Sequence, residues 1–353
     1  MTEAMEISVT KVERSKLLDM NMDSLPFGKY FTDHMLEADF INGEWTNVEI
    51  KPYQPLLLEP SNAALHYGQS IFEGIKAFRQ ENGEVAIFRP YENLNRFNVS
   101  ADRMQMPAIS EEIFIEGMKQ LIALDVNWIP NRPEHSLYIR PFMFATDEVI
   151  GVRPSETYKF IILLSPTGPY FAAPMRIICE EKYTRAAPGG TGFAKCAGNY
   201  AGSLKAQAEA KKNGFDHVLW MDVKEHKYVQ EIGVMNFFVI IGNSVITPNI
   251  GDTILDGITR KSAITLFSEM GFEIEERPLS IEEIIAAYKA GTLREVFGAG
   301  TAATIALIKE LRYKDYVMEF NTDSLTIAPE MKKNMDAIKN GSVEDRFGWM
   351  EKI

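Results

Sequence analysis

GGTGFAKCAGNY, residues 189–200, places four glycines and one lysine directly before a predicted helix. Lys195 stands between Ala194 and Cys196, and burial among such small or apolar neighbours disfavours a charged ammonium. The ordinary alternative is that a lysine in a glycine-rich loop is a solvated surface charge. The neighbours favour the other interpretation, in which Lys195 is a nucleophilic amine in a dry cleft.

Two further turns combine glycine with threonine. GITR at residues 257–260 opens a helix predicted over Thr259–Met270, and GAGTA at residues 298–302 follows the strand-like Glu295–Phe297. Helix N-termini and glycine turns present unpaired backbone amides, and threonine adds a hydroxyl donor, so such turns suit a phosphate dianion. Each turn alone is a weak signal, because glycine also serves tight turns and close packing.

Glu231 is a candidate binding residue because of where it lies. It belongs to VQEIGVMN at residues 229–236, just before a buried strand predicted over Val234–Ile241. A glutamate at a strand end usually points outward. If Glu231 points inward it requires a cationic partner, and a protonated pyridine nitrogen would be one.

The chain as a whole is predicted to form two domains, since 353 residues exceed one ordinary core. The chain-breaking cluster PTGP at residues 166–169, with Pro174 shortly after, predicts an interdomain connection over residues 166–175. This connection separates a small N-terminal domain, residues 1–165, from a larger domain, residues 176–353. Strand signals are scattered among helices without a regular βαβ rhythm, which predicts an α+β fold.

Periodicity and capping residues predict the individual elements. Ser110 caps one helix ahead of Glu112, and Ser280 with Glu283 forms a capping box for another helix that Gly291 closes. The other predicted elements are a helix from Pro90 with Leu94, Phe97, Ala101 and Met104 on its apolar face, a helix over residues 200–212 closed by Gly214, and strands over residues 85–88, 137–144, 160–164 and 218–221.

Composition argues against several classes of protein. A formal net charge of −12 opposes binding to nucleic acid or to an acidic membrane, and no apolar run approaches the ~20 residues of a spanning helix. The two cysteines, Cys179 and Cys196, provide neither a disulfide framework nor a metal site. Residues 1–23 mix acidic and basic side chains without the features of an export or import signal. We therefore expect a cytoplasmic protein without metal.

Seven blocks of sequence follow one another along the chain: FGKYFTDHM at residues 27–35, LHY at 65–67 with FEG at 72–74, YIRP at 138–141, the lysine stretch, and residues 231–236, 257–260 and 298–302. In this order they resemble the branched-chain aminotransferases of pyridoxal-phosphate (PLP) fold type IV, and the likeness covers nearly the whole chain. It implies an α+β fold like that of D-amino-acid aminotransferase, with a small α/β N-terminal domain and a larger, mixed, β-barrel-like C-terminal domain. It also implies reversible transfer of the amino group of L-leucine, L-isoleucine or L-valine to 2-oxoglutarate.

The resemblance assigns each cofactor contact to a residue. Lys195 would hold PLP covalently and then move the proton between the substrate Cα and C4′ of the cofactor. Glu231 would keep the pyridine nitrogen protonated, and Tyr200 would donate to the phenolic oxygen. The phosphate would bind four groups: Arg96, the backbone amides of Ile258 and Thr259, and Thr301.

The substrate pocket must accept an apolar side chain in one half-reaction and the glutamate carboxylate in the other, and an unpaired buried charge would be costly. The resemblance gives Arg140 to the distal carboxylate and the amides of Thr301 and Ala302 to the α-carboxylate. Tyr67 and Val152 would come from the partner subunit of a homodimer. The expected wall consists of Phe27, Tyr67, Phe72, Tyr138, Val152 and Tyr170, and for each aromatic residue among them core packing is the alternative role.

Two other functions stay open from the sequence. Other fold-type-IV enzymes, a D-amino-acid aminotransferase or an aminodeoxychorismate lyase, share the lysine, the glutamate and the phosphate turns; Tyr138 with Arg140 and the block over residues 65–74 favour the branched-chain interpretation. A non-catalytic, PLP-free binding protein with the same fold is the second alternative. Some family members carry a Cys-x-x-Cys pair where this chain has Ala303 and Ala306, so thiol regulation is not expected.

Overall fold

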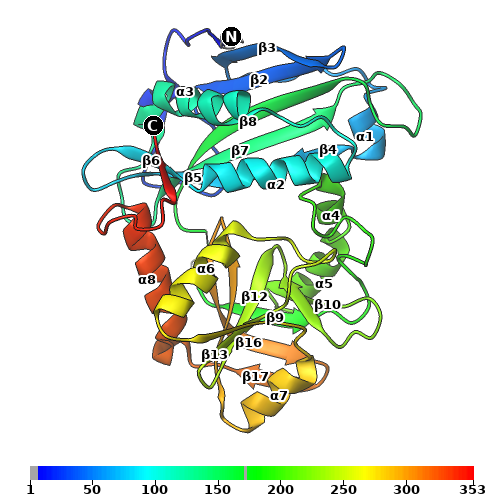
Figure 1. Ribbon diagram of the computed structural model, residues 1–353, viewed down its shortest axis with the longest axis vertical. Coiled ribbons are helices and arrows are strands. Elements are labelled where there is room, and N and C mark those ends of the chain that lie inside the picture. The colour runs from blue at the N-terminus through cyan, green and yellow to red at the C-terminus, as the bar shows by residue number, and fades with distance from the viewer. Residues whose placement is uncertain (1–6, 171–172) are drawn as a thin grey trace. The chain divides into compact units, whose positions relative to one another are not determined.

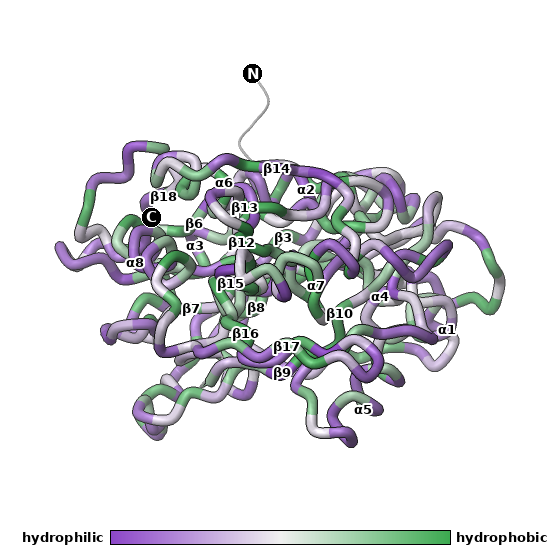
Figure 2. The backbone as a smooth tube through the Cα atoms, turned by 90° about the horizontal axis from the view of Figure 1, so that it is seen from below, coloured by the Kyte–Doolittle hydropathy of each residue, from purple (hydrophilic) through white to green (hydrophobic). Residues whose placement is uncertain are grey.

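The computed structural model describes residues 7–170 and 173–353 (Figure 1). Two short segments lie outside the described residues. They are residues 1–6, within the stretch expected to lack a signal, and residues 171 and 172, within the expected interdomain connection. Strand β12 (Met235–Ile241) is largely apolar, whereas β15 (Leu293–Gly300) carries Arg294 and Glu295 before its buried apolar residues; Figure 2 colours the backbone by hydropathy. Within the described ranges, no helix has the length and apolar character needed to cross a membrane.

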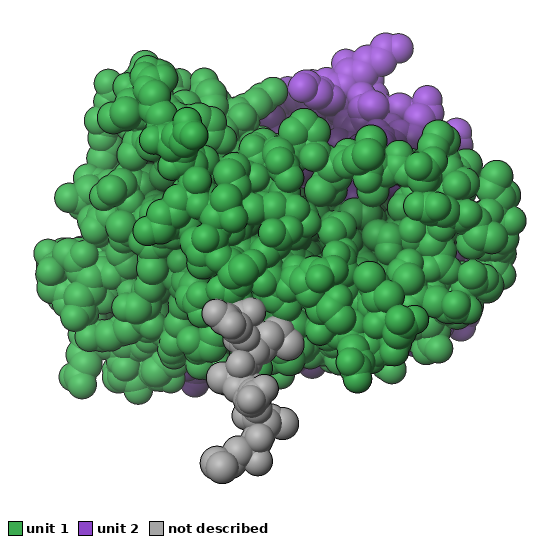
Figure 3. Space-filling view, turned by 90° about the horizontal axis from the view of Figure 1, so that it is seen from above, with its two compact units in different colours: residues 1–170, 194–198, 338–353 green, residues 171–193, 199–337 purple. Residues whose placement is uncertain are grey.

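The chain divides into two compact units, each with its own hydrophobic core (Figure 3). Unit 1 contains residues 1–170, 194–198 and 338–353, and unit 2 contains residues 171–193 and 199–337. Unit 2 is therefore inserted into unit 1 along the sequence. The short piece that returns to unit 1 in the middle of the insertion, residues 194–198, carries Lys195.

Unit 1 is built on a nine-stranded sheet in the order β1-β3-β2-β8-β7-β5-β6-β18, with β4 pairing to β7. All these pairs are antiparallel except β1 with β3. The edge strand β18 comes from the far end of the chain. The strands are β1 Ser8–Val9, β2 His34–Ile41, β3 Glu44–Pro52, β4 Ser70–Phe72, β5 Ile75–Arg79, β6 Val85–Phe88, β7 Ser136–Ala145, β8 Tyr158–Thr167 and β18 Met350–Lys352.

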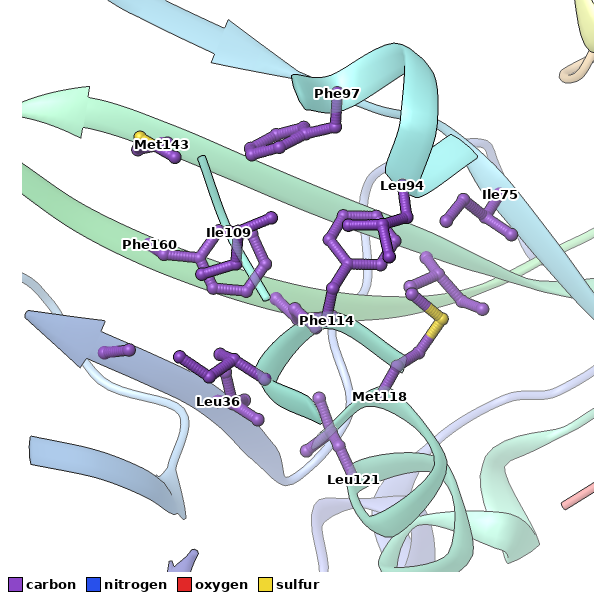
Figure 4. Packing of buried hydrophobic residues seen from close by; sticks show 14 of the residues in the cluster. Leu36, Ile75, Leu94, Phe97, Ile109, Phe114, Met118, Leu121, Met143 and Phe160 are labelled. Atoms are coloured by element: carbon purple, nitrogen blue, oxygen red, sulfur yellow. The ribbon is translucent and has the colours of Figure 1, made fainter. Parts of the chain in front are cut away.

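Helices pack on this sheet through aromatic side chains (Figure 4). The ring of Phe97 lies 5.5 Å from that of Phe114 and 5.6 Å from that of Phe160, centroid to centroid, and all three side chains are fully buried. Such rings dominate the energetics of a core because each removes a large apolar area from water. The helices of unit 1 are η1 Lys16–Asp19, α1 Ala63–Tyr67, α2 Pro90–Arg103, the π-helical turn η2 Glu112–Glu116, α3 Gly117–Leu124 and η3 Val126–Trp128.

Unit 2 contains a closed six-stranded barrel. Its strands follow the order β11-β10-β9-β16-β15-β12, and the pairing of β11 with β12 closes the ring. Strand β9 runs parallel to both neighbours and the other barrel pairs are antiparallel, so the predicted mixed barrel and the α+β class are confirmed. The strands introduced here are β9 Met175–Cys179, β10 His217–Met221, β11 Val229–Ile232, β13 Ser244–Thr247, β14 Glu273–Glu276, β16 Thr304–Tyr313 and β17 Tyr316–Glu319.

The predicted caps lie where the sequence places them. The hydroxyl of Ser280 accepts from the Glu283 amide at 3.1 Å, and that of Ser110 accepts from the Ile113 amide at 3.3 Å. Gly291 and Gly214 take the left-handed conformation, with φ of +69° and +81°. The remaining helices are α4 Ala197–Ala201, α5 Leu204–Lys212, α6 Ile258–Glu269, α7 Ile281–Lys289, η4 Thr322–Ser324 and α8 Ile327–Lys339.

Two local predictions were wrong. The helix expected over residues 200–212 is broken, because the amide and the hydroxyl of Ser203 both donate to the Tyr200 carbonyl, at 3.1 and 2.7 Å, and end α4. The glycines Gly298 and Gly300 do not form a turn after a short strand; they continue β15. A Cβ at either position would lie 3.1 Å from Met235, so glycine allows this close packing.

Candidate active site

Lys195 is fixed through its backbone to two elements of unit 1. Its amide donates to the hydroxyl of Ser100 on α2 at 2.9 Å, and its carbonyl accepts from the amide of Phe72 on β4 at 3.0 Å. The next residue, Cys196, pairs with Ile71 as an antiparallel bridge and is buried. The segment is therefore an extension of the sheet edge rather than a loose loop.

The side chain of Lys195 is half-buried and lies over an aromatic ring. Its Nζ is 5.0 Å from the centre of the Phe72 ring, and the guanidinium carbon of Arg140 is 4.7 Å from the same ring centre. An aromatic face attracts cations through its quadrupole. Phe72 therefore contacts both Lys195 and Arg140, the predicted catalytic amine and the predicted carboxylate-binding residue.

Arg140 is held within a cluster of rings. One of its Nη donates to the Tyr138 hydroxyl at 2.8 Å, and the ring of Phe27 lies 4.8 Å from those of both Tyr138 and Tyr170. Burial, with the nearby Tyr138, raises the pKa of Tyr170 above its usual value. Four of the predicted wall residues and the predicted arginine thus lie together in unit 1.

Among the described residues the Arg140 guanidinium has no carboxylate partner, and its Nε is buried without a hydrogen bond. A buried donor without an acceptor is costly, which is a feature of sites that receive a ligand. A carboxylate is the ligand whose geometry a guanidinium fork matches.

The tripeptide 72–74 is packed without spare room. A Cβ on Gly74 would lie 2.4 Å from the Tyr138 hydroxyl, so no larger residue fits there. Glu73 is fully buried and binds the guanidinium of Arg96 with both carboxylate oxygens, at 2.7 and 2.8 Å. Arg96 therefore lies on α2 as predicted, but in a bidentate ion pair that sequence reasoning missed.

Tyr67 and Val152 lie on two exposed segments of unit 1. Tyr67 ends α1 and is 41% exposed, while Val152 is 90% exposed in the loop between β7 and β8. Asp147 joins the two segments: its carbonyl accepts from Ala63 at the start of α1. Burial alone would raise the pKa of Asp147, but hydrogen bonds within the loop, the first from Thr157, and the charge of Arg153 hold it below the usual value.

Unit 2 places Glu231 inside the protein. It lies on β11, only 3% exposed, directly opposite Asn236 on β12. Its Oε1 accepts from the Leu255 amide at 2.7 Å, and Asn236 donates to the Leu255 carbonyl at 2.9 Å. The pair therefore fixes the loop that leads into α6.

The cation beside Glu231 is Arg185, whose Nε lies 3.2 Å from Oε2 in an ion pair without hydrogen-bond alignment. The sequence indicated that an inward Glu231 would need a cation, but it did not identify this arginine. The two residues are 46 positions apart (231 minus 185), and no local pattern links them.

The N-terminus of α6 begins at Gly257, which provides no side-chain cap. Ile258 and Thr259 follow in its first turn and are each 4% exposed, so the turn presents buried amides. A Cβ on Gly257 would lie 1.9 Å from the Asn236 side-chain oxygen. Glycine is therefore required where the loop meets the Glu231–Asn236 pair.

The other predicted residues of unit 2 are half-buried. Thr301 and Ala302 form the turn between β15 and β16, which closes on Thr304 in a left-handed conformation with φ of +61°. Tyr200 lies in α4. Described unit by unit, unit 1 holds the lysine, two arginines and the aromatic wall, and unit 2 holds the carboxylate and the amide turns.

Comparison with known proteins gives a consistent picture. The family model described as amino-transferase class IV matches residues 70–311. A Staphylococcus aureus protein named "Probable branched-chain-amino-acid aminotransferase" is 47% identical over 347 residues, which cover 96% of this chain and 97% of the relative.

Solved structures of branched-chain amino acid aminotransferases are also similar to this chain. The branched-chain amino acid aminotransferase of Escherichia coli is 28% identical with a TM-score of 0.73, over 90% of this chain and 99% of that one. A T.th. branched-chain amino acid aminotransferase, complexed with N-(5′-phosphopyridoxyl)-L-glutamate, is 26% identical with a TM-score of 0.71, over 89% of this chain and 97% of that one.

Replacing Gly257 tests whether the α6 loop is clamped as described. Gly257→Ala should lower the free energy of unfolding by about 1–3 kcal/mol, because the new methyl group must displace the Asn236 side chain. Gly251→Ala is the matched control in the same loop, since its Cβ meets nothing within 4 Å. Urea denaturation measures both, and equal stabilities would contradict the clamp.

Proposed function

Because the chain belongs to the class IV aminotransferases, and within them to the branched-chain-amino-acid aminotransferases, we propose that it moves the amino group of L-leucine, L-isoleucine or L-valine reversibly to 2-oxoglutarate. The products are branched 2-oxo acids and L-glutamate, and the cofactor is PLP. The observation that supports this best is the half-buried Lys195 amine over Phe72, on a segment held by backbone hydrogen bonds on both sides.

The chemistry of the donor set fits PLP. The cofactor requires a primary amine, a carboxylate for its pyridinium nitrogen and donors for its phosphate, and the chain provides Lys195, the buried Glu231, and Arg96 with the uncapped start of α6. When bound, PLP supplies the electron sink that stabilises a carbanion at the substrate Cα.

Each residue then has one role. Lys195 holds the cofactor covalently, and its amine afterwards moves the proton at the substrate Cα. Glu231 accepts a hydrogen bond from the pyridinium nitrogen, since each carboxylate oxygen can accept more than one hydrogen bond. Tyr200 donates to the phenolic oxygen. The phosphate binds Arg96, the Ile258 and Thr259 amides and Thr301.

The aromatic cluster around Arg140 in unit 1 suits a substrate that is apolar in one half-reaction and acidic in the other. Phe27, Phe72, Tyr138 and Tyr170 provide an apolar wall, and Arg140 lies on Phe72 without a carboxylate partner in the described chain. A guanidinium stacked on a ring is weakly hydrated, so leucine can cover it and glutamate can pair with it. The amides of Thr301 and Ala302 take the α-carboxylate.

A homodimer completes the proposal. The exposed Tyr67 and Val152 extend the wall of the neighbouring subunit's pocket, and the link through Asp147 holds the two segments together. We place the enzyme in the cytoplasm, where its two buried, free cysteines stay reduced.

The half-reaction separates this function from its alternatives. Purified protein with PLP should lose its visible absorbance on addition of L-leucine and not of D-alanine. Loss with D-alanine alone would indicate a D-amino-acid aminotransferase. A protein that stays colourless after incubation with PLP would indicate a binding protein without catalysis.

Lys195→Ala should reduce turnover by at least ~10³-fold while the fold is retained, because no other group then holds the cofactor and moves the proton. Borohydride reduction followed by mass spectrometry should place the pyridoxyl adduct on residue 195 of the unmodified protein. Lys205→Ala, an exposed lysine of α5, is the control and should leave turnover unchanged. An adduct on another side chain would refute the assignment.

Arg140→Gln should impair the glutamate half-reaction between ~10- and ~100-fold more than the leucine half-reaction, since only glutamate brings a second carboxylate. Single-turnover kinetics with each amino acid measure this ratio. Arg132→Gln, which changes an exposed arginine of the same unit, should leave the ratio unchanged. Equal losses for the two substrates would disprove the pairing.

Mixed subunits test the homodimer. Lys195→Ala and Val152→Asp should each be impaired, because Lys195→Ala removes the reactive amine and Val152→Asp introduces a charge into the apolar wall. If Val152 serves the neighbouring pocket, subunits re-associated in equal amounts regain about a quarter of normal activity, since half of the dimers then hold one intact site. Ile150→Asp, also highly exposed, is the control for the loop. No recovery would place Val152 in its own subunit's site.

A further inference from the structure

Glu73 is a buried charge that the proposed roles do not use. Its exposed fraction is 0%, and a carboxylate in such a position is stable only when it is paired and hydrogen-bonded. Arg96 provides the pairing through Nε and Nη2, at 2.7 and 2.8 Å. The Gly74 amide adds a third donor at 3.1 Å.

The position of Glu73 is fixed from three sides. The amide of the preceding Phe72 donates to the Lys195 carbonyl at 3.0 Å, and the amide of Glu73 donates to the Pro141 carbonyl on β7 at 2.8 Å. The following Gly74 lies against the Tyr138 hydroxyl. The carboxylate therefore has a defined place relative to the lysine segment, and Arg96 takes its orientation from that carboxylate.

We propose that Glu73 is a positioning residue for recognition of the cofactor's phosphate, acting through Arg96. The proposal rests on the proposed function, which assigns Arg96 to the phosphate. A bidentate carboxylate fixes the plane of the guanidinium, so its donors are oriented before the phosphate arrives. Glu73 accepts hydrogen bonds from two of the five N–H donors of this guanidinium.

A second role for Glu73 would have the opposite effect on phosphate binding. A carboxylate that only neutralises Arg96 competes with the phosphate, and its removal would strengthen phosphate binding. A carboxylate that positions Arg96 has the reverse effect, because without it the arginine side chain gains rotamer freedom that binding must remove. The two roles therefore predict affinity changes of opposite sign.

Glu73→Gln distinguishes them, because it keeps the size of the side chain and removes its charge. Apoprotein is titrated with PLP and, separately, with pyridoxal, which lacks the phosphate; absorbance gives both dissociation constants. We expect PLP affinity to fall about tenfold and pyridoxal affinity to change less than about twofold. A selective loss of this kind would not follow from general destabilisation, which weakens both ligands alike.

Glu92→Gln is the matched control. Glu92 lies on the same helix as Arg96 and pairs with Arg89, so the substitution removes a comparable charge from α2. The preference for PLP over pyridoxal should stay unchanged. If Glu73→Gln does not yield folded apoprotein, Glu73→Asp replaces it: the shorter carboxylate keeps the charge but cannot reach both donors, and the same selective loss is expected.

A double-mutant cycle with Arg96→Ala separates this inference from the proposed function. Arg96→Ala should itself reduce the preference for PLP, and adding Glu73→Gln should reduce it no further. If Arg96→Ala leaves the preference intact, the phosphate assignment of Arg96 fails. If Arg96→Ala reduces it while Glu73→Gln leaves PLP binding unchanged or tighter, or weakens both ligands equally, the positioning role alone is refuted.

Discussion

The backbone hydrogen bonds of Lys195 are the constraint on which the candidate site of unit 1 depends. The Ser100 hydroxyl and the Phe72 amide hold both sides of this residue, so five residues inside the inserted unit become part of unit 1. A reactive amine needs a fixed position, and backbone bonds provide it without using the side chain. The long lysine side chain then lies on Phe72 and presents its amine for chemistry.

Each unit places charged side chains beside apolar ones and pairs its buried carboxylate with an arginine. In unit 1 the Phe72 ring contacts the cations of Lys195 and Arg140. The buried carboxylate of Glu73 pairs with Arg96 in unit 1, and that of Glu231 pairs with Arg185 in unit 2. In unit 2, Glu231 and Asn236 bind the amide and the carbonyl of Leu255. Glu231 and Asn236 lie opposite each other because β11 pairs with β12, the pairing that closes the barrel.

Local features were predictable from the sequence, and pairs distant in sequence were not. Ser280 and Gly291 mark the ends of α7 because capping is a matter of a few adjacent residues. The role of Lys195, predicted from its small and apolar neighbours, stays a prediction. The partners of Glu73 and Glu231 were missed because each pair joins separate segments of the chain, and no periodicity reports such a contact. The break before α5 was missed because the sequence does not show whether a serine hydroxyl bonds a backbone carbonyl. In the folded chain the Ser203 hydroxyl bonds the Tyr200 carbonyl and ends α4.

The pairing of β18 with β6 has a consequence for how the chain is made. Met350 lies opposite Phe88, so about 260 residues separate the two strands. During synthesis at the ribosome, the β6 edge stays uncovered while all of unit 2 emerges. An open edge is a template for pairing with other chains. The β6 edge of the nascent chain is therefore open to pairing with other chains until residues 350–352 have been made.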